Sequence, residues 1–165
     1  MSQENVELVR AGFAAHNRGD LDALVEFYDP EVVFETLLLG THHGNEAIRL
    51  IYEENRKTLA GYDVVPVELI DAGDKVVAVA QMVGAGTVSQ IALNDRFAFV
   101  FTFRGDRCVR EQAFRNREEA LEEVGTRPRA LGQLSVTLRE AERERERHQA
   151  DCGARPLRGQ SREGR

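Results

Sequence analysis

Apolar residues recur three and four positions apart in three stretches of the first 60 residues, which is the spacing of helices with one buried face. The predicted helices are 3–17, 20–29 and 45–59. Asp20 and Asn45 are the expected N-caps, because their short polar side chains can accept a hydrogen bond from the first helical turn. Asp29-Pro30 is expected to end the second helix, since the residue before a proline is pushed out of the α region.

The remaining segments are rich in β-branched residues or alternate with a period of two, which predicts strands. These strands are 31–38, 62–71, 75–83, 88–103 and 107–115, and a closing helix is expected at 117–124. The segment 40–44 is expected to be a loop, and Gly84-Ala85-Gly86 a bulge or turn rather than a phosphate-binding loop. The element order α-α-β-α-β-β-β-β-α predicts the α+β class, with three N-terminal helices against a curved, mostly antiparallel sheet.

Four phenylalanines occupy alternating positions of the longest predicted strand: Phe97, Phe99, Phe101 and Phe103. Side chains alternate across a strand, so the four rings share one face, which we expect to lie toward the helices. The other face carries smaller residues: Ala98, Val100 and Thr102. A small, uncharged face suits packing against a second sheet and favours a homodimer through the outer face of the sheet.

Composition places the chain among globular proteins, with 165 residues of which 42% are hydrophobic and 30% charged. The net charge of −6 argues against a nucleic-acid binder. No apolar run approaches the roughly 18 residues of a membrane-spanning helix, so no membrane partner is expected. Only Cys108 and Cys152 are present, and the first residues lack the pattern of a secretory signal, so cytoplasmic localisation is expected.

The charge and the aromatic residues are divided unevenly near Gly125. Residues 1–125 contain 12 basic and 22 acidic side chains and all eleven aromatic residues, whereas 126–165 contain 10 basic and 6 acidic side chains. A segment so poor in large apolar groups cannot offset its ordering entropy by burial. We therefore expect a folded domain over 1–125 and a charged, Arg-rich tail over 126–165 that is partly helical, at about 133–149, or disordered.

Five segments carry a resemblance to a known family: 17–24, 29–32, 44–49, 70–77 and 114–121. With this element order, residues 1–125 resemble the SnoaL-like family of the nuclear-transport-factor-2-like, or ketosteroid isomerase-like, superfamily. The resemblance implies a cone-shaped sheet wrapped by helices around an apolar cavity. Members of the family include polyketide cyclases, isomerases, hydrolases and non-catalytic binders, so the resemblance implies a fold more specifically than an activity.

The chain departs from the family pattern at two positions. Relatives often place an acid/base aspartate at the end of the last strand, two residues after an aromatic residue, and here Asn116 follows Phe114. An amide cannot be a general base, although it can donate a hydrogen bond to a ligand oxygen. The histidine or tyrosine often found midway along the long strand is matched by Phe99.

Adjacent histidines in the loop before the third helix, His42 and His43, are candidates for proton transfer because imidazole titrates near neutrality. The alternative is that both are solvated loop residues. Strand alternation puts Glu35 on the face opposite Val32, Phe34 and Thr36, and the resemblance implies that these three are internal, so Glu35 is expected to face outward. His16 is expected to have a structural role at the negative end of the first helix.

The sequence therefore predicts catalytic roles for His42, His43 and Asn116, with no metal and no cofactor. The expected ligand-binding residues are Phe13, Phe27, Tyr28, Phe34, Tyr52, Gln81, Phe97, Phe99, Phe101, Gln112 and Phe114. The predicted function is binding of a small hydrophobic, oxygen-bearing molecule, with cofactor-free isomerase, cyclase or hydrolase chemistry by proton transfer. The alternative is a non-catalytic dimeric binding or interaction module whose cavity is closed by its own side chains.

Overall fold

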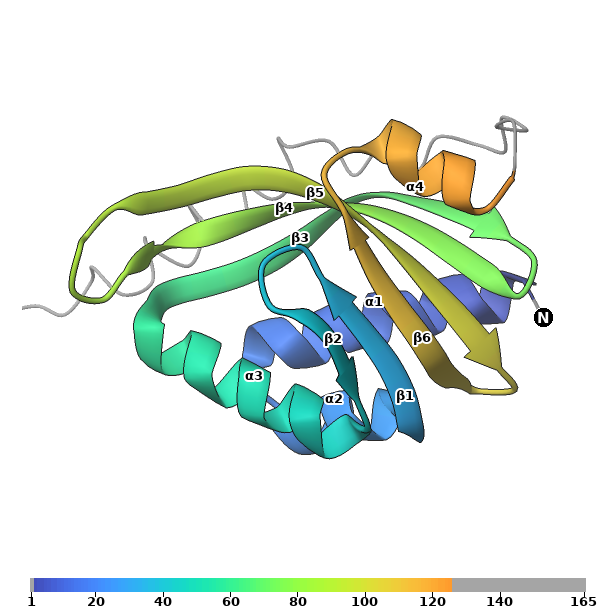
Figure 1. The fold of residues 1–165 in the computed structure, drawn as a ribbon, viewed down its shortest axis with the longest axis horizontal. Coiled ribbons are helices and arrows are strands. Elements are labelled where there is room, and N and C mark those ends of the chain that lie inside the picture. The colour runs from blue at the N-terminus through green and yellow to red at the C-terminus, as the bar shows by residue number, and fades with distance from the viewer. Residues whose placement is uncertain (1, 126–165) are drawn as a thin grey trace, which may run out of the picture. The chain divides into compact units, whose positions relative to one another are not determined.

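The structure, a computed structural model, describes residues 2–125, so the predicted tail over 126–165 lies outside the described residues. Within this range, six strands form one curved sheet in the order β2-β1-β6-β5-β4-β3 (Figure 1). Neighbouring strands are antiparallel except β1 and β6, which run parallel. The α+β class and the mostly antiparallel sheet are thus confirmed.

The helices and strands of the described residues follow the predicted order, with one strand added between β1 and α3. They are α1 (Ser2–Arg18), α2 (Leu21–Phe27), β1 (Tyr28–Thr36), β2 (Gly40–His43), α3 (Asn45–Thr58), β3 (Leu59–Ala72), β4 (Lys75–Gly86), β5 (Ala92–Arg104), β6 (Arg107–Phe114) and α4 (Arg117–Glu123).

Three helices cover one face of the sheet, which we call the inner face, and α4 lies on the opposite, outer face (Figure 1). On the inner face, Val9 and Phe13 of α1 and Leu24 of α2 belong to the same buried cluster as Ala78 of β4 and Phe101 of β5. The phenylalanine row of β5 therefore faces the helices, as its alternation predicts.

The second helix is shorter than predicted. It begins after Asp20, whose carboxylate accepts a hydrogen bond from the Ala23 N–H at 3.1 Å, as expected of an N-cap. It ends at Phe27 rather than at Asp29-Pro30, because Tyr28 adopts an extended conformation and pairs with Cys108 of β6. Pro30 lies inside β1 at an irregularity between Tyr28 and Val33, where a residue without an N–H interrupts no ladder pairing.

The predicted loop over 40–44 is instead mostly strand β2, which pairs with β1 as a short hairpin. Gly44, not Asn45, is the N-cap residue of α3, and Asn45 is the first residue of the helix. Gly44 has a positive φ of 82° and its N–H donates to the Val32 carbonyl at 2.8 Å. The backbone conformation that joins β2 to α3 favours glycine, which explains why the asparagine does not cap.

Gly84-Ala85-Gly86 forms the end of β4, where Gly84 and Ala85 pair with Leu93 and Ala92 of β5, so the predicted turn is wrong. The pairing of β4 with β3 is irregular between Ala60 and Asp63, so a bulge lies in β3 opposite Gly84. A Cβ atom at Gly84 would lie 3.2 Å from the Tyr62 Cα, so the glycine permits a close approach of β3. The turn follows at 87–91, and β5 begins at Ala92 rather than at residue 88.

An extra residue in β6 changes the side-chain alternation of that strand. Thr102 pairs with Arg110 and Phe103 with Cys108, so Val109 has no partner of its own in β5. Such a bulge shifts the alternation by one residue. Cys108 faces the helices, and after Val109 the inner positions are Glu111 and Ala113, opposite Phe101 and Phe99.

The outer face of the sheet is covered at its middle by α4. Ala120 and Leu121 pack against Ala98 and Val100 of β5 and against Val77 and Val79 of β4. The small, uncharged residues of β5 thus have a packing partner within the same chain. The homodimer that they suggested stays a prediction.

We predict that Leu121→Ala lowers the free energy of unfolding by about 2–3 kcal/mol, because it removes a buried side chain that closes the outer face of the sheet. Equilibrium unfolding in urea measures the change. Leu50→Ala is the matched control, since Leu50 is 66% exposed whereas Leu121 is 8% exposed. Equal losses for the two variants would contradict the assigned packing of α4.

Candidate functional site

A cavity of about 680 Å³ lies between the first three helices and the inner face of the sheet. This volume is within the range of roughly 300–1,000 Å³ that is usual for small-molecule sites. This volume favours an open cavity over the alternative predicted from sequence, a cavity closed by its own side chains. Most of the lining residues are aromatic or aliphatic, and the charged or polar ones besides tyrosine are His16, Thr36, Asn55, Asp95, Glu111 and Arg115.

Eight of the eleven predicted ligand-binding residues line this cavity: Phe13, Phe27, Tyr28, Phe34, Tyr52, Phe97, Phe99 and Phe101. They come from α1, α2, α3, β1 and β5, which converge because each buries one apolar face against the others. Phe13 contacts the rings of Phe99 and Phe101 edge-on, with centroids 6.3 and 5.8 Å apart. Edge-to-face packing of large rings gives the cavity a rigid apolar wall.

The three predicted site residues of the last strand and its end, Gln112, Phe114 and Asn116, lie on the outer side instead. Gln112 donates to a Glu35 carboxylate oxygen at 3.1 Å, and Phe114 packs in the outer cluster with α4. Asn116 is the N-cap of α4 and accepts a hydrogen bond from the Glu119 N–H at 2.9 Å. The prediction failed because the Val109 bulge turns the residues at 111 and 113 inward.

Gln81 also faces outward. It pairs in register with Arg96, and its side-chain amide donates to Asn94 Oδ1 at 3.0 Å. The sequence correctly placed Gln81 on the same face as Val77 and Val79, but that face packs under α4 rather than toward the cavity.

His42 and His43 lie in β2, at an edge of the sheet, and neither belongs to the cavity wall of the described residues. The His42 ring nitrogen Nε2 lies 3.1 Å from the Leu39 carbonyl oxygen, and His43 is exposed. Glu35 faces outward as expected and forms an ion pair with Arg110 at 2.7 Å. The geometry thus favours the alternative reading of both histidines as surface residues.

Glu111 is the polar residue that sequence analysis missed. It is buried in the cavity wall, and Tyr28 donates a short hydrogen bond from its hydroxyl to Glu111 Oε2. Burial raises the pKa of Glu111 from 4.5 to about 7, against a smaller opposing effect of the Tyr28 hydrogen bond. Among the described residues no cation pairs with this carboxyl, so a substantial fraction is protonated near neutral pH.

Tyrosines surround the buried carboxyl. Burial raises the pKa of Tyr28 and Tyr52 well above 10 and that of Tyr62 to about 12, and the nearby Glu111 carboxylate adds to the shift in each case. All three phenols therefore stay protonated at physiological pH. The inner end of the cavity is a set of neutral hydroxyl groups around one carboxyl that exchanges a proton.

His16 lines the same cavity and is buried, 5% exposed. Its ring packs edge-on against Tyr52 and Tyr62, with centroids 5.0 and 5.1 Å apart. Burial lowers the pKa of His16 despite a hydrogen bond with Asn17 that favours the charged form. The lowered pKa favours the neutral ring at pH 7. The predicted structural role of His16 at the end of α1 stays a prediction.

The outer part of the cavity wall includes the β1–β2 turn and the ends of β5 and β6. Leu37, Leu38 and Leu39 of this turn line the wall and are exposed at 41%, 94% and 58%. The turn is closed by Thr36 Oγ1, which accepts from the Leu39 N–H at 2.8 Å. The exposed part of the wall thus presents leucine side chains together with the charged Asp95 and Arg115.

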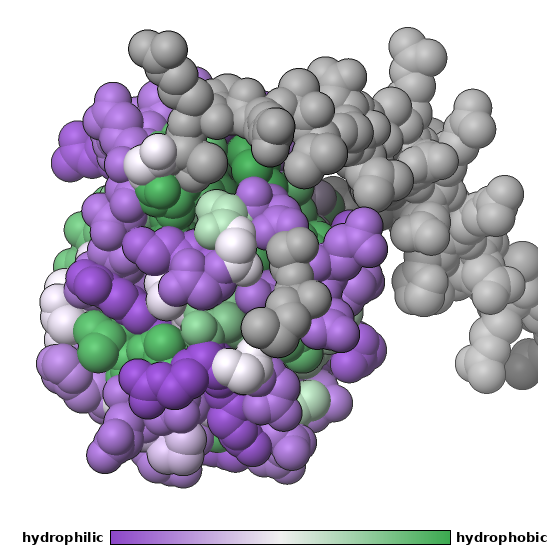
Figure 2. All heavy atoms as spheres, turned by 90° about the vertical axis from the view of Figure 1, so that its right-hand side faces the viewer, coloured by the Kyte–Doolittle hydropathy of each residue, from purple (hydrophilic) through white to green (hydrophobic). Residues whose placement is uncertain are grey.

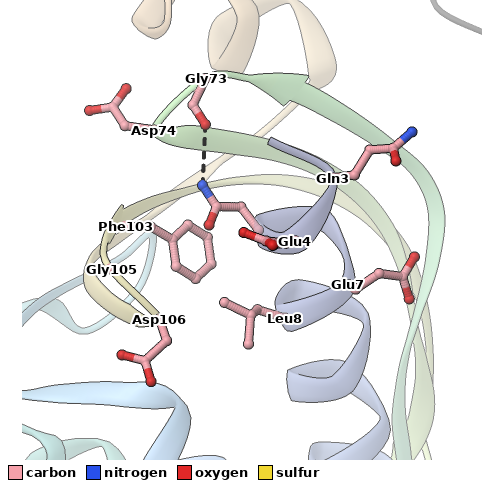
Figure 3. A pocket seen from close by; sticks show the side chains of 10 residues that line it. Gln3, Glu4, Glu7, Leu8, Gly73, Asp74, Phe103, Gly105 and Asp106 are labelled. Carbon is pink, nitrogen blue, oxygen red and sulfur yellow. Dashed lines mark hydrogen bonds between the residues drawn. The ribbon is translucent and has the colours of Figure 1, made fainter. Parts of the chain in front are cut away.

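A second, more open hollow of about 960 Å³ lies between the start of α1 and the turns after β3 and β5. Leu8 and Phe103 lie toward its centre, whereas the Glu7 and Asp74 carboxylates point away (Figure 3). Its buried amide, Asn5, donates to the Gly73 carbonyl at 3.2 Å. Figure 2 faces this end and shows hydrophilic residues around smaller hydrophobic patches. The hollow is a packing junction between helix and turns.

Residues 2–125 support neither a metal site nor a membrane-spanning helix. No group of three or more His, Cys, Asp or Glu side chains in this range could hold a metal ion. None of the helices in this range is both long and apolar enough to span a bilayer.

The family model of the SnoaL-like domain matches residues 9–111. No curated protein matches the sequence at a significant level.

Solved structures share the fold. A proposed polyketide cyclase from Xanthomonas campestris pv. campestris is 20% identical, with a TM-score of 0.64 over 74% of this chain and 98% of that one. A hypothetical protein with a ketosteroid isomerase-like fold from Catenulispora acidiphila, in complex with trimethylamine, is 20% identical, with a TM-score of 0.62 over 73% and 94%. TerC, co-crystallised with polyporic acid, is 20% identical, with a TM-score of 0.61 over 74% and 99%. At these identities the likeness shows the fold alone.

We predict that Glu111→Gln removes a pH dependence of stability. A carboxyl whose pKa is higher in the folded state binds more protons when folded, so its contribution to the free energy of unfolding falls as pH rises from about 4.5 to about 7. The difference in the free energy of unfolding between wild type and Glu111→Gln should fall by about 3 kcal/mol across this window, because the folded-state pKa lies near 7 instead of 4.5.

Urea unfolding at a series of pH values measures this difference. His16, whose pKa is lowered, has the opposite pH dependence, but it is present in both proteins and cancels in the comparison. Glu46→Gln, on an exposed side chain of α3, is the control and should leave the wild-type slope in place. A difference that stays flat between pH 4.5 and pH 7 would contradict the buried state of Glu111.

Proposed function

The chain belongs to the SnoaL-like domain family, and from this we propose that it binds a neutral, largely apolar ring compound with a ketone or hydroxyl oxygen and catalyses proton transfer on it. The sequence-based resemblance to the SnoaL-like family of the nuclear-transport-factor-2-like superfamily is thereby confirmed. The finer statement about ligand and reaction is supported by the cavity, whose size and apolar rings suit a compound of two or three fused rings.

The observation that carries the proposal is the buried Glu111 carboxyl with Tyr28 as its hydrogen-bond partner. In the protonated form, Oε2 accepts from Tyr28 and the other carboxyl oxygen can donate its proton to a ligand oxygen. A neutral acid in an apolar wall polarises a carbonyl group more effectively than it would in water, because no solvent competes. Glu111 thus takes the role that the sequence assigned to Asn116.

Two of the proteins that share the fold are associated with this class of ligand. A proposed polyketide cyclase and a protein co-crystallised with polyporic acid share the fold. Carbonyl-bearing ring compounds are what the Glu111 and Tyr28 pair and the phenylalanine wall would recognise. The cytoplasmic localisation and the homodimer predicted from the sequence remain proposals beside this one.

A non-catalytic binding protein is the second candidate, favoured by the apolar character of most of the cavity wall. Both candidates require binding in the cavity, and only the enzyme requires exchange of protons with the bound compound. Ligand binding therefore tests the cavity as a binding site for both candidates, whereas only proton exchange tests catalysis.

We predict that 2-tetralone, a ketone fused to a benzene ring, binds the wild-type protein and that Glu111→Leu weakens this binding about tenfold. The variant removes the hydrogen-bond donor to the ketone oxygen, which is worth about 1.4 kcal/mol. Tetralin, the hydrocarbon without the oxygen, should bind both proteins equally. Isothermal titration calorimetry with the two compounds separates the polar contribution from the apolar one.

Ala113→Phe provides a steric test of the same site. Ala113 lines the cavity opposite Phe99, so a phenyl group there would occupy the ligand's space and reduce affinity for both compounds by about tenfold or more. Ala92→Phe, at an exposed position at the start of β5, is the matched control. Unchanged affinity in Ala113→Phe, or no binding of 2-tetralone to wild type, would refute the proposal.

A further inference from the structure

We propose that His16 is the general base of the cavity and that Asn17 is the positioning residue that holds the proton of the neutral ring on Nδ1, so that Nε2 is the basic nitrogen. This inference rests on the proposed function, since it assigns the group that receives the ligand's proton. It also replaces His42 and His43, whose place at the sheet edge keeps them away from the cavity wall.

The Asn17 side chain is held in one orientation by the backbone of β3. Its Nδ2 donates to the Val64 carbonyl at 3.0 Å, and its Oδ1 accepts from the Val64 N–H at 2.9 Å. These two bonds distinguish the amide nitrogen from the amide oxygen, because a flipped amide would lose both. Oδ1 is therefore the atom that faces His16.

The same amide oxygen sets the tautomer of His16. Nδ1 lies 2.9 Å from Asn17 Oδ1, an atom that can only accept, so Nδ1 must carry the proton. In a neutral ring, the lone pair is then on Nε2, the nitrogen on the other side of the ring from Asn17. The general rule for histidine is that the partner of one nitrogen decides the state of the other.

The surroundings of His16 keep the ring neutral and fixed. Tyr52 and Tyr62 pack edge-on against it, from α3 and β3. Among charged groups, Arg56 of α3 lowers the pKa of His16 and Asp63 of β3 raises it, both by less than burial does. The Arg56 guanidinium also donates to the His16 carbonyl at 3.2 Å, which fixes the end of α1.

Tyr52 connects this histidine with the buried acid. Its ring contacts His16, and its phenol lies within electrostatic reach of Glu111. The wall of one cavity thus includes both Glu111, a neutral hydrogen-bond donor, and His16, whose Nε2 is the basic nitrogen of the neutral ring. A single bound ketone could face both groups.

The reaction step is enolisation of the bound ketone. His16 Nε2 takes a proton from the carbon next to the carbonyl group, and the electrons of that C–H bond form the C=C bond of the enol. The carbonyl oxygen gains a proton from Glu111, so the charges left are imidazolium and carboxylate. When the His16 imidazolium returns a proton to carbon and the enol oxygen returns its proton to the Glu111 carboxylate, both residues regain their starting states. Protonation at a different carbon gives an isomerised product.

The tautomer can be measured directly without a ligand. Nitrogen-15 NMR of the histidine rings at pH 7 should show His16 neutral with the proton on Nδ1, the less common form in free histidine. A proton on Nε2, or a charged ring, would overturn the proposal whatever ligand the cavity binds.

Catalysis can be measured by exchange of the C1 protons of 2-tetralone for deuterium in heavy water, followed by proton NMR. His16→Gln should slow the protein-dependent exchange by about a hundredfold or more while changing 2-tetralone affinity by less than about threefold. His43→Gln is the matched control and should exchange at the wild-type rate. Exchange that persists in His16→Gln would overturn the proposal.

Asn17→Asp tests the positioning role by pH profile. A carboxylate at this position still accepts from His16 Nδ1 and stabilises the imidazolium, so the exchange rate should reach half its maximum at a higher pH than in wild type. An unchanged profile would overturn the role of Asn17. If wild type binds 2-tetralone without exchange, His16 is not a base but the proposed binding stands. If wild type does not bind it, the proposed function fails while the NMR result still decides the tautomer.

Discussion

The extra residue in β6, Val109, is the constraint on which the candidate site depends. It shifts the alternation of the strand so that Glu111 faces the helices opposite Phe101. Without the shift, the inner position would fall on residues 110 and 112, which in the structure meet Glu35 on the outer face. One inserted residue in a ladder thus decides whether the cavity contains an acid.

The two faces of β5 pack against different parts of the molecule. Its inner face carries large rings that pack edge-on with Phe13 and Phe27. The small residues Ala98 and Val100 on the outer face allow the short helix α4 to approach closely. The outer face is thereby closed, whereas the rings, the curved sheet and the helices leave a hollow that side chains do not fill.

Burial acts on the two titratable groups of the cavity in opposite directions. It raises the pKa of Glu111 and lowers that of His16, because in both cases an apolar wall disfavours the charged form. The same physical cause therefore produces a neutral donor and a neutral acceptor near pH 7. Their hydrogen bonds to Tyr28 and Asn17 orient them and oppose, by a smaller amount, the pKa shift that burial imposes.

The sequence by itself determined what depends on neighbours along the chain. The helical spacing and the aromatic face of β5 follow from local periodicity and the Asp20 cap from its short polar side chain, and the structure agrees with each. Only the tertiary structure decided the Val109 bulge, the extended Tyr28 and the buried His16. These depend on pairing between distant strands and on packing across the cavity, as in the bond between Tyr28 and Glu111, 83 positions apart. Local sequence patterns do not reveal such contacts. A bulge, for example, inserts one extra residue and leaves the alternation within each flanking segment intact, so the sequence does not show where it lies.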